Sequence, residues 1–190
     1  MLNKEMMKSD IERELTGKGD YVQIDMIRRF LKENLSNDIR RFASMKLASI
    51  YENRSMYADA AILYNKLAEI ALNYADRMTC YSKQAENYIK AGYFDGADMA
   101  INKVMGEVKP MEKTKFSDAI KGFYLAQAHI YEKERRRSKA VEIYEKMLLI
   151  KTLPEIEKTE IKNKLAQLYK DLGMVQKYLG LQEKPKSKEI

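Results

Sequence analysis

The amino-acid sequence predicts an all-α protein, and three observations lead to that prediction. Apolar residues recur at helical spacing from Asp38 onward, and no segment sustains the period of two that marks a β-strand. The 190 residues include only 8 Gly and 3 Pro, too few for the many turns of a β-sandwich or barrel. A pattern of Tyr and Ala also repeats along the chain, which indicates stacked helical elements.

Glycines and prolines mark where the predicted helices begin and end. Pro110 and Pro154 stand where a helix can begin, because proline has a helical φ and no N–H to lose. Gly92 and Gly173 stand where a helix can end in a left-handed cap. The unbroken run Met111–Glu134 predicts one unusually long helix.

Tyrosines set the register of the repeat. Tyr51, Tyr88 and Tyr131 each have Ala three residues before and Ala nine residues after, and no other tyrosine has both. Tyr169 has only the earlier Ala, at Ala166. These four register tyrosines are 37, 43 and 38 residues apart. One helical hairpin cannot bury its apolar face alone, so the pattern predicts hairpins that stack on their neighbours.

The pattern resembles the tetratricopeptide repeat, a 34-residue helix–turn–helix unit. That family has small residues at repeat positions 8 and 20, an aromatic residue at position 11, and large residues at positions 4 and 24. With the register tyrosines at position 11, position 8 holds Ala48, Ala85, Ala128 and Ala166, and position 20 holds Ala60, Ala97 and Ala140. Position 4 holds Tyr81 and Tyr124, and position 24 holds Tyr64, Ile101 and Tyr144. Position 7 departs from the family pattern in the second and third repeats, where it is Gln84 and Gln127 instead of Leu.

The resemblance covers roughly residues 41–180 and implies a right-handed superhelical array of antiparallel helix pairs. Such a TPR-like α-solenoid would contain about three and a half repeats here. We predict an N-terminal helical cap over residues 1–36, a repeat domain over 37–182 and a flexible basic tail over 183–190. Within the cap, Tyr21–Leu35 carries apolar residues on one helical face and predicts a helix.

Composition and motifs argue against catalysis. One Cys and one His leave no disulfide framework or Cys-rich zinc site and disfavour His-based metal sites and Ser-His-Asp triads. The chain has no phosphate loop, dinucleotide fingerprint or nucleophile elbow. We therefore expect no enzyme activity, no cofactor and no metal site. No leader-like or membrane-spanning apolar run is found, and the lone Cys80 suits a reducing compartment, so the expected location is the cytoplasm.

The resemblance also implies a concave groove lined by the first helix of each repeat. The predicted partner-binding groove residues are Lys46, Ser49, Asn53, Lys83, Glu86, Lys90, His129, Lys133, Lys164, Gln167 and Lys170. His129 is the only imidazole and is either a groove contact or an ordinary surface histidine. One subgroup clamps a C-terminal carboxylate with Lys, Asn and Arg. Met45 and Ser49 stand at its positions in the first repeat, so that clamp is not expected.

A predicted basic patch lies in the turn of the third repeat and comprises Arg135, Arg136, Arg137 and Lys139. Five of the seven residues 133–139 are basic, within a chain that has 35 Lys and Arg against 28 Asp and Glu. This patch suits a phosphate backbone or an acidic partner. It equally suits a turn that is merely solvated, and the sequence leaves both interpretations open.

Two functions follow from these patterns. The first is a non-enzymatic adaptor or scaffold that binds a partner segment on the concave face of a helical repeat array. The alternative is a basic accessory factor that docks on RNA or a ribonucleoprotein such as the ribosome. Self-association stays open as well, because repeat arrays with imperfect caps can pair through an exposed end.

Overall fold

A computed structural model describes residues 2–150 and 153–182, and within them the chain is all helical, with ten α-helices, one short 3-10 helix and no strand. This confirms the predicted all-α class. The helices are α1 (Lys8–Leu15), α2 (Asp20–Phe30), α3 (Asn37–Asn53), α4 (Tyr57–Glu69), α5 (Tyr74–Ala91), α6 (Phe94–Glu107), η1 (Pro110–Glu112), α7 (Lys113–Lys133), α8 (Arg137–Leu148), α9 (Glu155–Asp171) and α10 (Val175–Gln182). Within those residues, none of the helices combines the length and the apolar character needed to cross a bilayer.

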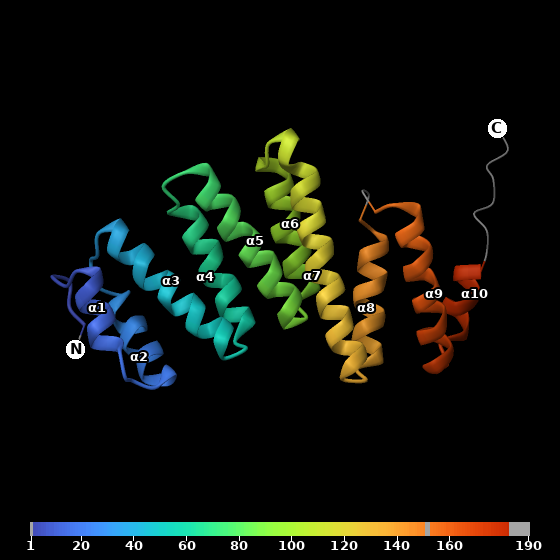
Figure 1. Cartoon of the computed structure of the whole chain (residues 1–190), viewed down its shortest axis with the longest axis horizontal. Helices are drawn as coiled ribbons and strands as arrows, with labels where there is room; N and C mark the ends of the chain where they lie inside the picture. Colours follow the sequence, from blue (N-terminus) through green and yellow to red (C-terminus); the bar gives the residue numbers. More distant parts are fainter. Residues whose placement is uncertain (1, 151–152, 183–190) are drawn as a thin grey trace. The chain divides into compact units, whose positions relative to one another are not determined.

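The chain divides into two compact units, Met1–Lys109 and Pro110–Ile190. The first unit contains α1–α6, and the second contains η1 and α7–α10. The ten α-helices of the described ranges are labelled in Figure 1. The predicted boundary between cap and repeats falls in the first unit, between α2 and α3. The division into cap, repeat domain and tail stays a prediction, and the tail lies outside the described residues.

In the first unit, helices α2–α5 each pack on the next helix along the chain. Four alanines of the repeat pattern lie at these contacts and are fully buried: Ala48, Ala60, Ala85 and Ala97. Because an alanine carries only a methyl group, it lets two helix axes approach closely, while larger residues such as Leu67 and Val104 fill the space beside it. The positions of these four alanines are therefore core positions, as the repeat pattern predicted.

The second unit repeats this arrangement, with α7 packed on α8, α8 on α9 and α9 on α10. Helix α7 has 21 residues, which confirms the long helix predicted from the unbroken run. Ala128 and Ala140 are fully buried, and the rings of Tyr124 and Tyr144 are 2% and 0% exposed. Seven of the eight tyrosines of the pattern are therefore buried packing residues, as predicted, and Tyr88 is only partly buried.

The turn inside each of the four repeat helix pairs has the same backbone geometry. The residue four positions after the register tyrosine has a left-handed backbone: φ is 57° at Ser55, 73° at Gly92, 57° at Arg135 and 66° at Gly173. The N–H of the following residue then donates to the carbonyl of the register tyrosine, at 2.8 to 3.0 Å. Such a bond satisfies a carbonyl that the end of the first helix leaves free. The caps predicted at Gly92 and Gly173 are confirmed.

At the N-terminal end, α1 and α2 bury Ile11, Ile27 and Phe30. Helix α2 ends at Phe30, earlier than the predicted Leu35. The guanidinium of Arg40 donates to the carbonyls of Leu31 and Glu33 at 2.9 and 3.0 Å, which holds the following residues in a non-helical link.

Cys80 lies near the middle of the first unit, on α5. It is 4% exposed, and burial raises the pKa of its thiol. A buried thiol with a raised pKa is a packing residue with little thiolate character.

Candidate functional site

The groove residues predicted in the first repeat lie on α3, the first helix of that repeat. Lys46 forms an ion pair with Glu12 of α1, with 3.1 Å between Nζ and Oε1. Ser49 and Asn53 are exposed. In this repeat one predicted groove residue is therefore paired with α1, and two are exposed without such a pair.

Glu52, beside the predicted groove residues, is the centre of a hydrogen-bonded cluster. Its carboxylate accepts from the Tyr64 hydroxyl at 3.1 Å and from the Asn87 amide at 2.8 Å. The ammonium of Lys83, a predicted groove residue, lies 3.5 Å from the same carboxylate. The cluster joins α3 and α4 of the first repeat to α5 of the second.

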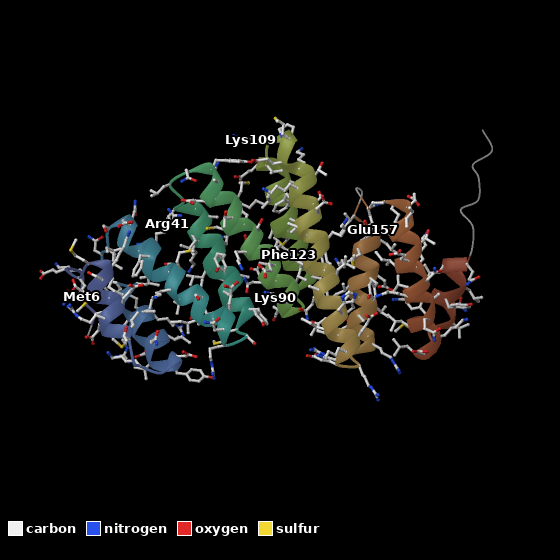
Figure 2. The ribbon with its side chains drawn as sticks, viewed as in Figure 1. Met6, Arg41, Lys90, Lys109, Phe123 and Glu157 are labelled. Atoms are coloured by element: carbon white, nitrogen blue, oxygen red, sulfur yellow. The ribbon has the colours of Figure 1, made fainter. Side chains whose placement is uncertain are left out.

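Glu86 extends this cluster along α5. It pairs with Lys83 at 3.1 Å and with Lys90, near the C-terminal end of the helix (Figure 2). Burial opposes ionisation of the Glu86 carboxyl, but hydrogen bonds from Lys90 and Lys83 outweigh it and lower its pKa. The Lys90 ammonium also lies 5.7 Å from the centre of the Tyr57 ring. The structure thus brings the three predicted groove residues of the second repeat into one charged cluster.

The second unit contains the same kind of contact. The Tyr144 hydroxyl donates to Glu132 at 2.9 Å and accepts from Lys164 at 3.0 Å. Lys164 also lies 3.6 Å from Glu132. We call this arrangement, and that of Glu52, Tyr64 and Lys83, the Glu–Tyr–Lys contact.

The Glu–Tyr–Lys contact has a fixed place in the repeat. Its Glu directly follows the register tyrosine, its Tyr stands at position 24, and its Lys comes from the first helix of the next repeat. At the corresponding positions after the register tyrosine of the second repeat, the sequence has Ile89, Ile101 and Ala126. The Glu–Tyr–Lys contact thus occurs once in each unit. Apolar residues replace it at the positions of the second and third repeats that would form it.

The remaining groove residues lie on first helices of the second unit. His129 and Lys133 are exposed on α7, and no described residue forms a hydrogen bond or ion pair with either. On α9, Gln167 donates to Asp171 at 2.8 Å, and the Lys170 ammonium lies 4.8 Å from the centre of the Tyr178 ring. His129 and Lys133 are therefore the most available polar side chains of the predicted groove in this unit.

The predicted basic patch is largely paired. Arg136 lies 4.6 Å from the centre of the Tyr131 ring and 3.4 Å from Glu134. Arg137 pairs with Asp171 at 3.7 Å, and Lys139 pairs with Glu142 at 2.8 Å. Arg135 is exposed, and no described residue pairs with it. These exposed pairs are weak and reduce the positive field that a phosphate backbone would meet.

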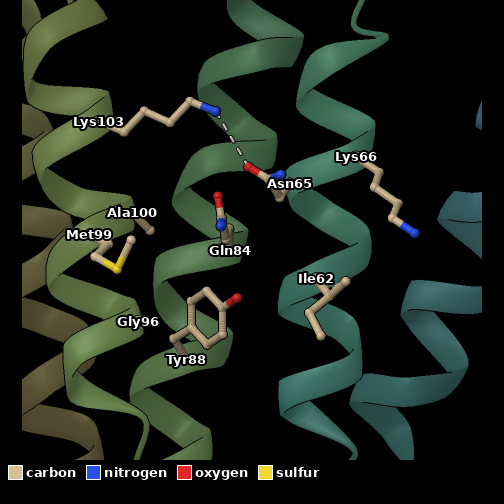
Figure 3. A pocket seen from close by; sticks show the side chains of 9 residues that line it. All are labelled: Ile62, Asn65, Lys66, Gln84, Tyr88, Gly96, Met99, Ala100 and Lys103. Carbon is tan, nitrogen blue, oxygen red and sulfur yellow. Dashed lines mark hydrogen bonds between the residues drawn. The ribbon is translucent and has the colours of Figure 1, made fainter.

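A pocket that the sequence did not predict lies within the first unit, with walls from α4 and α6 and a floor from α5 (Figure 3). We call it the α4–α6 pocket. The one signal in the sequence was Gln84, at a position where two other repeats have Leu. No group of three or more His, Cys, Asp and Glu side chains within the described ranges is placed to hold a metal ion.

Comparison with known proteins supports the repeat. Residues 124–157 match the family model of the tetratricopeptide repeat, and this segment contains most of the α7–α8 pair. The chain is a TPR-like helical-repeat protein, and its fold and the register of its alanines and tyrosines agree with that class. Repeats of this class form extended surfaces for protein partners.

Among solved structures, the crystal structure of BtubC (BKLC) from P. vanneervenii is similar at 15% sequence identity and a TM-score of 0.30. The similarity covers 90% of this chain and 87% of that one. No curated protein sequence matches the chain.

Proposed function

We propose that the chain is a non-enzymatic adaptor that binds a segment of a partner protein on the first-helix surfaces of its repeats. The observation that carries this proposal is the tetratricopeptide-repeat match over residues 124–157, on helix α7, where His129 and Lys133 are exposed and unpartnered within the described residues. A formal net charge of +7 favours a partner segment that is acidic.

The mechanism is contact between a preformed helical surface and an extended or helical segment. Because the first helices are already packed, the partner alone loses conformational freedom on binding. In the first unit, Lys83 and Lys90 are held in place by Glu86, and an incoming carboxylate would compete with that side chain for both ammonium groups. In the second unit, Lys133 would pair with the partner without first breaking a contact. We place the adaptor in the cytoplasm, since a single buried cysteine suits a reducing compartment.

The test is capture of partners by the tagged chain from a lysate of its own source, read by mass spectrometry. The lysate is divided and treated with nuclease or left untreated. The captured proteins are then compared for the wild type, Lys133→Glu and Lys115→Glu. Lys115 is exposed on the same helix, about 27 Å along it at 1.5 Å per residue, so its variant has the same charge change at a distant place.

A partner that survives nuclease, is lost on Lys133→Glu and is kept on Lys115→Glu supports the adaptor. Capture that Lys133→Glu leaves unchanged contradicts a site on α7. Binding that disappears with nuclease, and whose affinity falls by roughly 0.7 to 0.9 log units per log unit of salt for each phosphate contacted, supports docking on RNA instead. In that case Arg135→Glu is the variant that should weaken it, because Arg135 is the unpaired member of the basic patch.

A further inference from the structure

The α4–α6 pocket has the form of a second recognition site. Its volume is about 280 Å³. Sites for small molecules occupy about 300–1,000 Å³, so this pocket suits one or two side chains of a peptide better than a cofactor. It is lined by Ile62, Asn65, Lys66, Gln84, Tyr88, Gly96, Met99, Ala100 and Lys103. Its walls are second helices of the first two repeats, whereas the proposed adaptor surface lies on first helices.

The floor of the pocket contains an unsatisfied polar group. Gln84 is 7% exposed, and its side-chain oxygen Oε1 is buried with no hydrogen-bond donor. Figure 3 shows the amide between the two wall helices, among the lining side chains. A buried amide without a partner destabilises a fold, and most native proteins avoid one. Leu47 and Leu165 stand at the same repeat position and are 3% and 0% exposed. A buried leucine therefore fits this position in two other repeats, and Gln84 is not required there for packing.

The walls of the pocket offer apolar contact. Met99 is 75% exposed and Ile62 is 50% exposed, on opposite walls in Figure 3. The ring of Tyr88 lies beside Gly96, where a Cβ atom would come within 3.3 Å of the ring carbons. Gly96 therefore leaves room for this ring position.

The rim of the pocket is positively charged. The Lys103 ammonium lies 3.5 Å from the amide oxygen of Asn65 and 4.9 Å from the centre of the Tyr81 ring. Neither contact neutralises its charge. Lys66 has no described partner, while one carboxylate, Glu69, accepts from the other end of the Asn65 amide at 3.0 Å. The charged residues of the pocket lining are Lys66 and Lys103, so an acidic ligand would meet two cations there.

We propose that the α4–α6 pocket binds an acidic peptide segment of a second partner protein. An apolar side chain of the segment would lie between Ile62 and Met99, on the Tyr88 ring. A backbone N–H of the segment would donate to Oε1 of Gln84, and a carboxylate beside the apolar residue would pair with Lys103. Because the pocket lining includes none of the predicted groove residues, the chain would bridge two partners.

The first test uses a library of short random peptides displayed on phage, selected against the purified full chain. Enriched peptides are synthesised, and their Kd is measured by fluorescence anisotropy for the wild type, Gln84→Leu, Met99→Lys and Lys103→Glu. Met45→Lys is the matched control, since Met45 is 42% exposed on the first helix α3 and lies outside the pocket. The expected peptides combine a large apolar residue with Asp or Glu. Their affinity should fall at least about tenfold, or 1.4 kcal/mol, in each pocket variant and stay unchanged in Met45→Lys.

A second measurement separates binding from folding. Gln84→Leu should raise the thermal midpoint of the peptide-free chain by about 2–4 °C, because it removes the unsatisfied amide. The same variant should lower the affinity for the peptide. A lowered midpoint would mean that the amide is satisfied in solution and would overturn its role.

Three further results would each overturn the proposal. One is enrichment only of peptides that Met99→Lys does not affect. Another is enrichment of basic peptides. The third is a change of oligomeric state in Met99→Lys alone, seen by light scattering, which would assign the pocket to a second copy of the chain. If the peptides respond to Met45→Lys but not to Met99→Lys, the first-helix surface binds and the pocket does not, so the two proposals fail separately.

Discussion

The hydroxyl of Tyr144 accepts a hydrogen bond from the ammonium of Lys164 at 3.0 Å, although the two residues belong to consecutive repeats. The same hydroxyl donates to Glu132, so one phenol connects a carboxylate of its own repeat to a cation of the next. In the first unit, Glu52 connects Tyr64 and Lys83 in the corresponding place. Each unit therefore has a Glu–Tyr–Lys contact between successive first helices, in addition to the ion pair Arg41–Asp76 in the first unit and Lys121–Glu157 in the second.

Removing the tyrosine hydroxyl should show how much the Glu–Tyr–Lys contact stabilises its unit. We expect Tyr144→Phe to lower the free energy of unfolding by about 1–2 kcal/mol, because a hydrogen bond to a charged group is lost while the ring stays in place. Tyr64→Phe should have a smaller effect, since Tyr64 has one such bond and Tyr144 has two. Urea denaturation gives both values. Tyr93→Phe is the control, because Tyr93 is 64% exposed and its hydroxyl has no described partner.

The ion pairs of Glu86 should make stability depend on pH. Hydrogen bonds from Lys90 and Lys83 outweigh burial and lower its folded pKa below the unfolded value of about 4.3. Their contribution is therefore complete above about pH 5 and is lost as the pH falls through the folded pKa. We expect Glu86→Gln to be less stable than the wild type at neutral pH, and the difference to shrink near pH 3. Glu160→Gln, at an exposed site on α9, is the control and should change the stability little at neutral pH.

The turn residue Arg135 should be better replaced by glycine. Its φ of 57° is left-handed, a conformation that costs a non-glycine residue about 1–2 kcal/mol. Glycine loses more chain entropy on folding, so the net gain expected from Arg135→Gly is about 0.5–1 kcal/mol. Ser55→Gly should give a similar gain in the first unit, where φ is also 57°. Thermal denaturation measures both, and a lowered midpoint in either variant would contradict this account of the turn.

Overpacking at a small position tests the repeat register. Ala97 is fully buried, so Ala97→Leu should lower the free energy of unfolding by about 1–3 kcal/mol. Ala126 is exposed on α7, and Ala126→Leu should change it little. Equal large losses in the two variants would show that the register is wrong.

The fold was largely predictable because each repeat records its packing locally. A small residue three before a tyrosine and another nine after it mark one helical hairpin. This pattern placed α3–α8, and Tyr169 with Ala166 placed α9. The early end of α2 was not predictable, because the long side chain of Arg40 holds the carbonyls of Leu31 and Glu33 from the next helix. Apolar periodicity contains no record of such a side-chain bond.

The site was less predictable, because a repeat position predicts a face but not a partner. Lys83 and Lys164 lie on first helices, as expected for groove residues, yet both contact carboxylates 31 and 32 residues earlier in the chain. Gln84 stood out in the sequence only as a departure from Leu. The role of Gln84 depends on the pocket between α4 and α6. The spacing of residues along the chain does not predict that pocket.

Cys80 allows local opening of the first unit to be measured in the wild-type protein. It is the chain's only thiol, it is buried on α5, and the second unit contains no cysteine. A thiol reagent would therefore react only when α5 opens to solvent, and its labelling rate under native conditions would measure the free energy of that opening for the first unit alone. Mass spectrometry would count modified molecules directly, without any introduced probe.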